Sequence, residues 1–289
     1  MDRRGRWLGL LVCLASVSGC ALRPRPTATP AGAPVADRSP VADQSIVLND
    51  HSLRLHFARG AHGPQRPLLV YATGDGGWHR KDLAAYRQLV SYGYPTVGFD
   101  AHQYVTHLGR NGSTTPARLA ADYERIIDAA KATLALPAEY PVVLVGVSRG
   151  AGLSVAAAGD PTLRPLIAGV LAVALTREEE YVKRIRGLRR RDRQPAVPEM
   201  VELYDYLPRL AATPIAVIQS TRDQYLPAAD ARALFGADTP WRWLQAIQAR
   251  NHSFGGARAQ LYDAMNRSLT WLARSSAASA RPSAAAPHG

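Results

Sequence analysis

Apolar runs of strand length alternate with longer amphipathic segments over about 230 residues of this chain, and this alternation constrains the fold more than any other feature. A strand, a helix and a second parallel strand are joined by a right-handed crossover. Repeated units of this kind therefore build a mostly parallel sheet with helices on both faces. We predict a single α/β domain over residues 45–274, a length that suits one sizeable core.

The predicted elements begin with an antiparallel hairpin and continue with six further strands. The hairpin covers 46–48 and 53–57, and the later strands cover 67–72, 96–99, 140–144, 166–175, 215–218 and 243–247. Helices are predicted over 81–92, from Thr115-Pro116 onward, over 151–158 and over 257–273.

One strand-to-helix turn carries the pattern G-x-S-x-G, in the residues Gly146 to Gly150. The two glycines allow a tight turn that exposes the Oγ atom of Ser148 at the end of a sheet. Gly and Ser are also common turn residues, so the pattern needs partners elsewhere in the chain before Ser148 becomes a candidate nucleophile.

Such partners are provided by two residues that lie later in the chain than Ser148, an aspartate and a histidine. Asp223 follows the predicted strand that ends at Ile218, and His252 follows the one that ends near Ile247. A nucleophilic serine needs an imidazole base and a carboxylate that orients it, and α/β-hydrolases carry them in the order Ser, Asp or Glu, His. We therefore predict the α/β-hydrolase fold with a triad of Ser148, Asp223 and His252. The alternatives are a turn or capping role for Asp223 and a surface-loop role for His252.

The oxyanion hole of such a site needs two backbone amides. Arg149, directly after the nucleophile, supplies the first. The glycine-rich turn Thr73–Trp78 is the predicted source of the second, with Asp75 as first choice and Gly76 as second. A phosphate-cradling loop is the rival interpretation of this turn, although it lacks a G-K-[ST] ending and G-x-G-x-x-G spacing. This chemistry needs no metal or cofactor, and we expect none.

The amino terminus predicts export. Residues 1–19 combine a basic start with a short apolar stretch, which is typical of a secretory signal rather than a membrane span. The segment ends at Val17-Ser18-Gly19-Cys20, which resembles a lipoprotein lipobox and implies a lipid anchor on Cys20. An ordinary signal peptide with an incidental cysteine is the alternative. Cys13 would leave with the signal, so no disulfide is expected in the mature protein.

Two low-complexity segments flank the predicted domain. Residues 20–44 are predicted to be a flexible tether, and residues 275–289 a disordered tail. Ala21 follows the cysteine, and by resemblance to sorted lipoproteins this favours the periplasmic face of the outer membrane, with the inner membrane as the alternative. We expect a monomer.

Several motifs together resemble the VirJ/AcvB family, a periplasmic branch of the α/β-hydrolases. The most specific is Gly74–Trp78, which is similar to the family's G-D-G-G-W signature, and Thr115-Pro116 with Ala121-Asp122 extends the match. The serine turn is also shared, and His252-Ser253-Phe254 resembles the family's H-H-F. The resemblance covers roughly residues 67–273.

The resemblance implies an enzyme that removes lysyl or alanyl groups from aminoacyl-phosphatidylglycerol, with Ser148, Asp223 and His252 as its triad. One departure bears on the substrate: the family usually has G-Y-S-F-G-A-D at the turn, whereas this chain has an arginine, Arg149, after the serine. Preference for the head group is therefore open.

Charge supports an anionic partner. Residues 183–193 hold seven basic side chains against one aspartate, which is +6 of the chain's formal +12. They lie in a segment, about 177–208, where we predict a small cap, and a basic cap would attract anionic phospholipid. A solvated basic helix is the alternative. Nucleic acid is not expected as a partner, because the chain has an export signal and no recognition motif.

These observations predict a periplasmic, lipid-anchored serine hydrolase that cleaves the aminoacyl ester of aminoacyl-phosphatidylglycerol through an acyl-enzyme. Two alternatives stay open at this point. One is an esterase of soluble small esters. The other is a non-catalytic periplasmic binding or secretion-assisting protein, since VirJ-type proteins are also linked to export.

Overall fold

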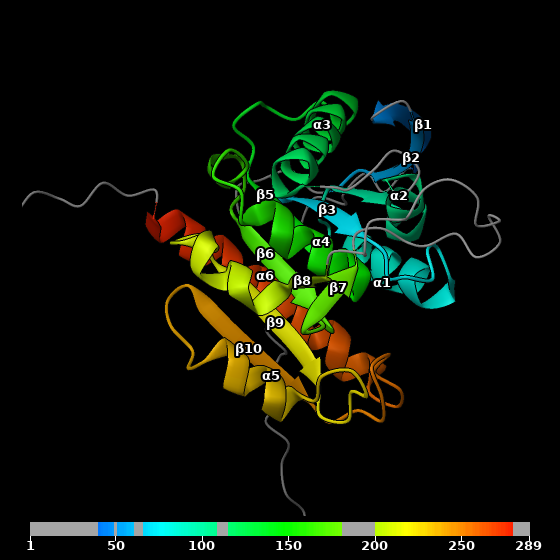
Figure 1. Ribbon diagram of the computed structural model, residues 1–289. Helices are drawn as coiled ribbons and strands as arrows, with labels where there is room; N and C mark the ends of the chain where they lie inside the picture. Colours follow the sequence, from blue (N-terminus) through cyan, green and yellow to red (C-terminus); the bar gives the residue numbers. More distant parts are fainter. Residues whose placement is uncertain (1–39, 49–50, 61–65, 109–114, 181–199, 280–289) are drawn as a thin grey trace, which may run out of the picture. The chain divides into compact units, whose positions relative to one another are not determined.

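A sheet of eight strands runs through the domain, with helices on both sides of it (Figure 1). Both of its faces carry buried apolar side chains. The computed structural model describes residues 40–48, 51–60, 66–108, 115–180 and 200–279. All of these residues belong to a unit that starts at Val35. The predicted signal peptide, Cys20, most of the predicted tether and the basic run 183–193 lie outside the described residues.

The strands alternate with helices in the chain, as the sequence predicts. The eight strands are β1 (Pro40–Leu48), β2 (His51–Ala58), β3 (Leu68–Ala72), β4 (Thr96–Phe99), β5 (Val142–Val147), β6 (Gly169–Val173), β9 (Ile215–Ser220) and β10 (Arg242–Ile247). Their order in the sheet is β1-β2-β4-β3-β5-β6-β9-β10. The first two strands are antiparallel to their neighbours, and the six from β4 to β10 run parallel. The predicted hairpin and the mostly parallel sheet are both confirmed.

Two layers of helices bury the two faces of the sheet. The layers contain α1 (Arg80–Ser91) and α6 (Arg258–Ser279) on one face, and α2 (Ala101–Leu108), α3 (Pro116–Leu134), α4 (Arg149–Ala158), α5 (Ala228–Phe235) and the 3-10 helix η2 (Leu203–Leu210) on the other. A one-turn 3-10 helix, η1 (Arg164–Leu166), precedes β6.

Successive side chains of the central strands point to opposite faces of the sheet, and this explains why a helix layer packs on each face. In β5, Val143 and Val145 pack with α1 and α6, whereas Val142 and Leu144 pack toward α3 and α4. All four side chains are fully buried. A strand that is apolar at every position is what a parallel sheet covered on both faces requires.

Local signals fix the ends of some helices. Thr115 caps α3, because its Oγ1 accepts a hydrogen bond from the backbone N–H of Arg118 at 3.2 Å, and Pro116 occupies the first helical position. The helix predicted to begin at Thr115-Pro116 is therefore confirmed.

The boundaries of the domain differ from those predicted. Strand β1 begins at Pro40, inside the segment predicted as tether, because residues 40–48 pair with β2 and gain backbone hydrogen bonds. Helix α6 continues to Ser279, four residues beyond Ser275, where the tail was predicted to begin.

The segment predicted as a cap, about 177–208, contains a second small sheet. Strands β7 (Glu178–Glu180) and β8 (Met200–Glu202) pair antiparallel, and η2 follows. This insertion lies in the chain between β6 and β9.

Parallel strands bring their carboxyl ends to one edge of a sheet, and the loops after them form a crevice there. The residues that the sequence predicts for the catalytic machinery all lie in the loops after β3, β5, β9 and β10 or, for Arg149, at the first position of α4. Central β5 places Ser148 in the middle of this edge.

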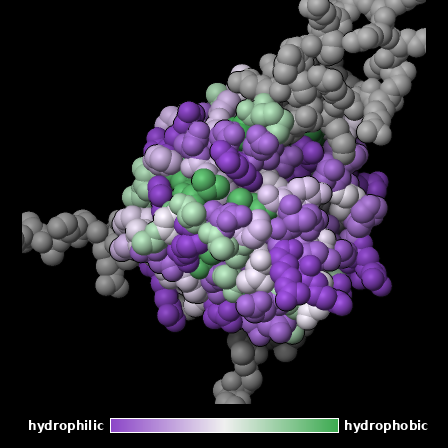
Figure 2. All heavy atoms as spheres, turned by 60° about the horizontal axis from the view of Figure 1, so that its bottom comes forward, coloured by the Kyte–Doolittle hydropathy of each residue, from purple (hydrophilic) through white to green (hydrophobic). Residues whose placement is uncertain are grey.

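The surface is mixed in character. Figure 2 shows one face on which hydrophilic side chains surround limited areas of apolar ones. Within the described ranges, none of the helices combines the length and apolar character needed to cross a bilayer.

Candidate active site

Ser148 lies in a strained turn between β5 and α4. Its backbone has φ 53° and ψ −116°, and its N–H donates to the carbonyl of Val173 at 2.8 Å. A side chain at Gly146 would collide with the backbone of Gly150, and a side chain at Gly150 would collide with the end of β3. Both glycines of the G-x-S-x-G pattern are therefore required by close packing, and the turn points the serine hydroxyl into the crevice.

The structure brings Ser148, His252 and Asp223 together, although they are far apart in sequence. The Nε2 atom of His252 lies 2.8 Å from the Oγ of Ser148, and its Nδ1 lies 2.7 Å from the Oδ2 of Asp223. A hydroxyl that contacts an imidazole, itself oriented by a carboxylate, has the geometry for nucleophilic attack on a carbonyl group.

The carboxylate of Asp223 is fully buried but well supplied with donors. Its Oδ1 accepts from the backbone N–H groups of Tyr225 at 2.9 Å and Leu226 at 3.4 Å. Its Oδ2 accepts from Gln219 at 3.1 Å and contacts the ring of His252. Hydrogen bonds of this kind offset the desolvation of a buried charge. The turn that was the alternative role for Asp223 is therefore present as well, and it holds the carboxylate in place.

Gln219 is a part of the site that the sequence analysis missed. Its amide nitrogen donates to Asp223 Oδ2 and, at 2.6 Å, to the carbonyl of Leu226, and the side chain is fully buried. The signal available in the sequence was a glutamine directly after the apolar run of β9, and the structure shows that this position is fully buried.

The loop that carries His252 is fixed from two sides. The backbone N–H of His252 donates to the Oε1 of Gln224 at 3.1 Å, and the Tyr225 ring meets the imidazole edge-on at 4.9 Å between ring centroids. Tyr225 is 66% exposed, which makes it a large apolar surface at the mouth of the site.

The glycine-rich turn after β3 is held by Asp82 of α1. The Oδ1 of Asp82 accepts from the backbone N–H of Gly74 at 2.8 Å and from the hydroxyl of Tyr71 at 3.2 Å. Burial raises the pKa of Asp82 above its ordinary value, while these donors act to lower it. Burial first, and then the nearby Asp82 charge, raises the pKa of Tyr71 well above the usual range.

Trp78, at the end of the same turn, packs into an aromatic cluster. Its ring meets Tyr86 edge-on at 5.4 Å and His56 at 4.8 Å between centroids. The tryptophan of the G-D-G-G-W element therefore attaches the turn to α1 and β2.

The side chain of Arg149 connects the serine turn with two other segments. Its Nε lies 2.6 Å from Asp75 Oδ1, and its Nη1 lies 2.9 Å from Glu179 Oε1. The backbone amides of Arg149 and Asp75 are the predicted oxyanion donors, so the two residues chosen for their amides are also joined by their side chains.

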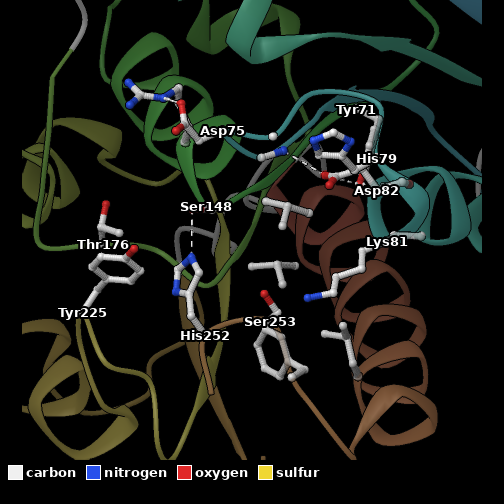
Figure 3. Close-up of a pocket in the computed structure, with 18 of the residues that line it drawn as sticks. Tyr71, Asp75, His79, Lys81, Asp82, Ser148, Thr176, Tyr225, His252 and Ser253 are labelled. Atoms are coloured by element: carbon white, nitrogen blue, oxygen red, sulfur yellow. Dashed lines mark hydrogen bonds and ion pairs between the residues drawn. The ribbon is translucent and has the colours of Figure 1, made fainter. Parts of the chain in front are cut away.

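A cavity of about 620 Å³ opens beside Ser148 (Figure 3). Its lining includes the predicted oxyanion residues Asp75, Gly76 and Arg149. In Figure 3, Lys81 extends its ammonium group into the cavity toward Ser253, while Thr176 and Tyr225 lie on the other side of His252. Ser148 and His252 therefore face a space that can hold a substrate.

The lining carries charges of both signs. Lys81, Arg80 and Arg258 come from the amino-terminal turns of α1 and α6, where Asp82 also lies, and Glu178 and Glu179 come from β7. No three His, Cys, Asp or Glu side chains in the described part of the chain are grouped so that they could hold a metal ion.

The comparison that decides the family concerns the first part of this domain. The family described as "Bacterial virulence protein (VirJ)" matches residues 67–211, which is 145 of the 289 residues. The chain belongs to the VirJ family. The match contains the glycine-rich turn and Ser148 but ends before Asp223 and His252, so the structure rather than the match brings those two residues to the serine.

Solved structures with the same fold cover nearly the whole domain. An esterase from Pyrococcus furiosus has a TM-score of 0.58 at 14% identity, covering 82% of this chain and 93% of that one. Est1E from Butyrivibrio proteoclasticus has a TM-score of 0.56 at 13% identity, covering 82% and 99%. The esterase domain of a Rhodothermus marinus protein has a TM-score of 0.54 at 17% identity, covering 81% and 98%.

These likenesses show the α/β-hydrolase fold, as the chain order of the candidate triad predicts. No curated protein sequence matches the chain. Function must therefore be argued from the site itself.

Proposed function

We propose that this VirJ-family protein is a serine carboxylic-ester hydrolase. The observation that carries the proposal is the continuous set of contacts from Ser148 Oγ through the His252 ring to the buried Asp223 carboxylate, at the wall of a substrate-sized cavity. A non-catalytic binding role would not require a strained serine with an imidazole at 2.8 Å.

The mechanism follows from this geometry. Ser148 Oγ attacks the ester carbonyl as His252 Nε2 takes its proton, and Asp223 stabilises the resulting imidazolium. The amides of Arg149 and of Asp75 or Gly76 stabilise the oxyanion. His252 then protonates the leaving alcohol, an acyl-enzyme forms, and water activated by the same imidazole releases the acid.

For the substrate we propose the aminoacyl ester of aminoacyl-phosphatidylglycerol, as the family resemblance implies. The charges of the cavity support this choice, because such an ester carries an ammonium group on its acyl side and a phosphate on its alcohol side. Lys81, Arg80 and Arg258 match the phosphate in charge, and Glu178 matches the ammonium.

Location remains part of the proposal. The basic start, the apolar stretch and Cys20 favour a lipoprotein held at the periplasmic face of a membrane, with the outer membrane preferred. An anchored monomer would meet anionic phospholipid as both surface and substrate.

A second candidate is hydrolysis of soluble small esters. Two observations favour it: the similar structures from Pyrococcus furiosus and Rhodothermus marinus are named esterases, and the cavity's volume suits a small molecule.

The first experiment removes the nucleophile. We expect the full-length protein to release amino acid from lysyl- or alanyl-phosphatidylglycerol in vesicles, and Ser148→Ala to abolish this release and all labelling by a fluorophosphonate probe. Ser253→Ala, a change at another serine of the same cavity, should still be labelled. Undiminished hydrolysis by Ser148→Ala would remove Ser148 as the nucleophile.

The second experiment separates the two substrate classes. Lys81→Glu should raise KM several-fold for a phosphate-bearing ester and leave KM for a neutral p-nitrophenyl ester unchanged. Arg87→Glu, an equal charge change on the exposed side of α1, is the matched control. If Lys81→Glu leaves KM unchanged for both esters, and the wild-type protein turns over the soluble ester faster, the second candidate is favoured.

A further inference from the structure

A partly buried charge cluster beside the site has side chains that the mechanism above does not use. It is centred on Arg149, Asp75 and Glu179, whose side chains are 11%, 49% and 12% exposed. The Nδ1 of His102 also lies 3.7 Å from Asp75 Oδ1, on the exposed side of the cluster. The guanidinium contacts one carboxylate at 2.6 Å and the other at 2.9 Å. Three segments thereby meet: the serine turn, the turn after β3 and strand β7.

The position of Asp75 creates an electrostatic problem. Its backbone amide is the first-choice second donor of the oxyanion hole, so its carboxylate belongs to the residue that must stabilise a developing negative charge. Like charges at short range in a partly desolvated site repel each other. An aspartate is therefore a poor residue at this place unless a cation neutralises it.

The guanidinium of Arg149 provides that cation. Arg149 follows the nucleophile directly, its backbone belongs to α4, and its side chain reaches back across the sheet edge to Asp75. A hydrogen bond between two charged groups also fixes the direction of the carboxylate, because the guanidinium is planar.

We propose that Arg149 is a positioning residue that neutralises and orients Asp75, so that the turn after β3 stabilises the oxyanion instead of opposing it. The proposal rests on the proposed ester hydrolysis. It assigns the guanidinium to the protein's own carboxylates, and so gives the arginine after the nucleophile a role in turnover rather than in binding the phosphate of a substrate.

Glu179 completes the cluster. It accepts from Arg149 and, at 3.3 Å, from the hydroxyl of Thr176, and it holds the far side of the guanidinium. Loss of Arg149 would remove the guanidinium from both carboxylates, and the carboxylate of Asp75 belongs to the residue whose amide we assign to the oxyanion hole. Loss of Glu179 would leave the pair of Arg149 and Asp75 intact.

The test is a set of variants of the full-length protein, assayed with a neutral p-nitrophenyl ester. Arg149→Met should lower kcat about tenfold or more, with little change in KM, because the lost interaction acts on the transition state. Adding Asp75→Asn to Arg149→Met should restore much of the lost kcat. Adding Glu179→Gln should restore less, and Glu179→Gln alone should have a small effect.

A matched control separates catalysis from stability. Arg232 forms an ion pair with Asp238 at the same 2.6 Å distance, on α5 and away from the cavity. Arg232→Met should lower the melting temperature without changing kcat. Arg149→Lys, which keeps the charge but loses the planar contact, should have a kcat between that of wild type and that of Arg149→Met.

The outcomes are distinct. The positioning role would be overturned if Arg149→Met with Asp75→Asn had a kcat no higher than Arg149→Met alone. It would also be overturned if Arg149→Met changed KM and left kcat unchanged. If the wild-type protein neither hydrolyses any ester nor reacts with a fluorophosphonate, the proposed function itself fails. Full activity of Arg149→Met in an active enzyme overturns only the inference about Arg149.

Discussion

Two groups of loops approach Ser148 from opposite sides, and each is held by an aspartate of a different kind. On the triad side, Asp223 is fully buried, accepts hydrogen bonds from backbone and side-chain donors, and touches the His252 ring. On the oxyanion side, Asp82 is half-buried, has a raised pKa, and holds only the backbone of Gly74 and the Tyr71 hydroxyl. The first carboxylate is one contact from the chemistry, whereas the second supports a backbone.

This difference teaches where charge matters in the site. A group that touches the base must keep its charge in every turnover, so it is surrounded by donors. A group that only shapes a turn can be replaced by any acceptor of the same form. Substitutions that retain shape but remove charge should therefore separate the two sides.

The largest effect is expected at Asp223. Asp223→Asn keeps the shape but should lower kcat about ten-thousand-fold, as the equivalent change does in serine proteases, because the amide favours the wrong tautomer of the imidazole and supplies no counter-charge. Steady-state kinetics measure this loss. Asp238→Asn, in an exposed ion pair with Arg232, serves as the control and should leave kcat unchanged. A loss below tenfold would place Asp223 with the supporting residues.

A smaller effect is expected at Gln219, which supports the triad carboxylate. Gln219→Leu removes one donor from a buried acceptor, which costs about 1–3 kcal/mol and predicts about a tenfold lower kcat with little change in KM. Gln245→Leu in the neighbouring strand β10 removes an amide bonded to Ser268 and Ala264 of α6, and should lower only the melting temperature. If both variants reduce stability alone, Gln219 has no positioning role.

The smallest effect is expected at Asp82. Because burial raises its pKa, the folded state holds the proton more tightly than the unfolded chain does, and its contribution to the free energy of unfolding falls as pH rises from the ordinary aspartate value through the raised one. Asp82→Asn cannot titrate, so it should gain stability relative to wild type on going from acidic to neutral pH. Its kcat should change less than about threefold, because an amide oxygen still accepts from Gly74.

Denaturant titrations of both proteins across this pH range measure the difference. A relative stability that falls toward neutral pH would show that the charged form of Asp82 is favoured by folding, and that the two aspartates are more alike than their surroundings suggest.

Local patterns were enough to predict most of the fold and the three side chains that the structure brings into contact as the candidate triad. The central strands of the parallel sheet are largely apolar runs. Ser148 follows β5 directly, and Asp223 and His252 lie in the loops after β9 and β10. The sheet edge then brings them together by geometry alone. Helices α2 and α5 had no sequence prediction, because each has only eight residues and spans barely two turns.

The contacts that link segments could not be predicted in the same way. Arg149 and Asp75 are 74 positions apart, and Gln219 meets Asp223 only because a turn folds back on β9. Nothing in the residues near Arg149 indicates which carboxylate it will reach. The pairing depends on three-dimensional packing, which single-sequence patterns do not contain.

The backbone of Ser148 bears on why this position holds a serine. A side chain at φ 53° and ψ −116° is strained by about 1–3 kcal/mol, and glycine would relieve most of that strain in the same turn. Folding therefore gains nothing from a serine at this position. The stability of the turn therefore does not explain the side chain at this position, and the chemistry of its hydroxyl does.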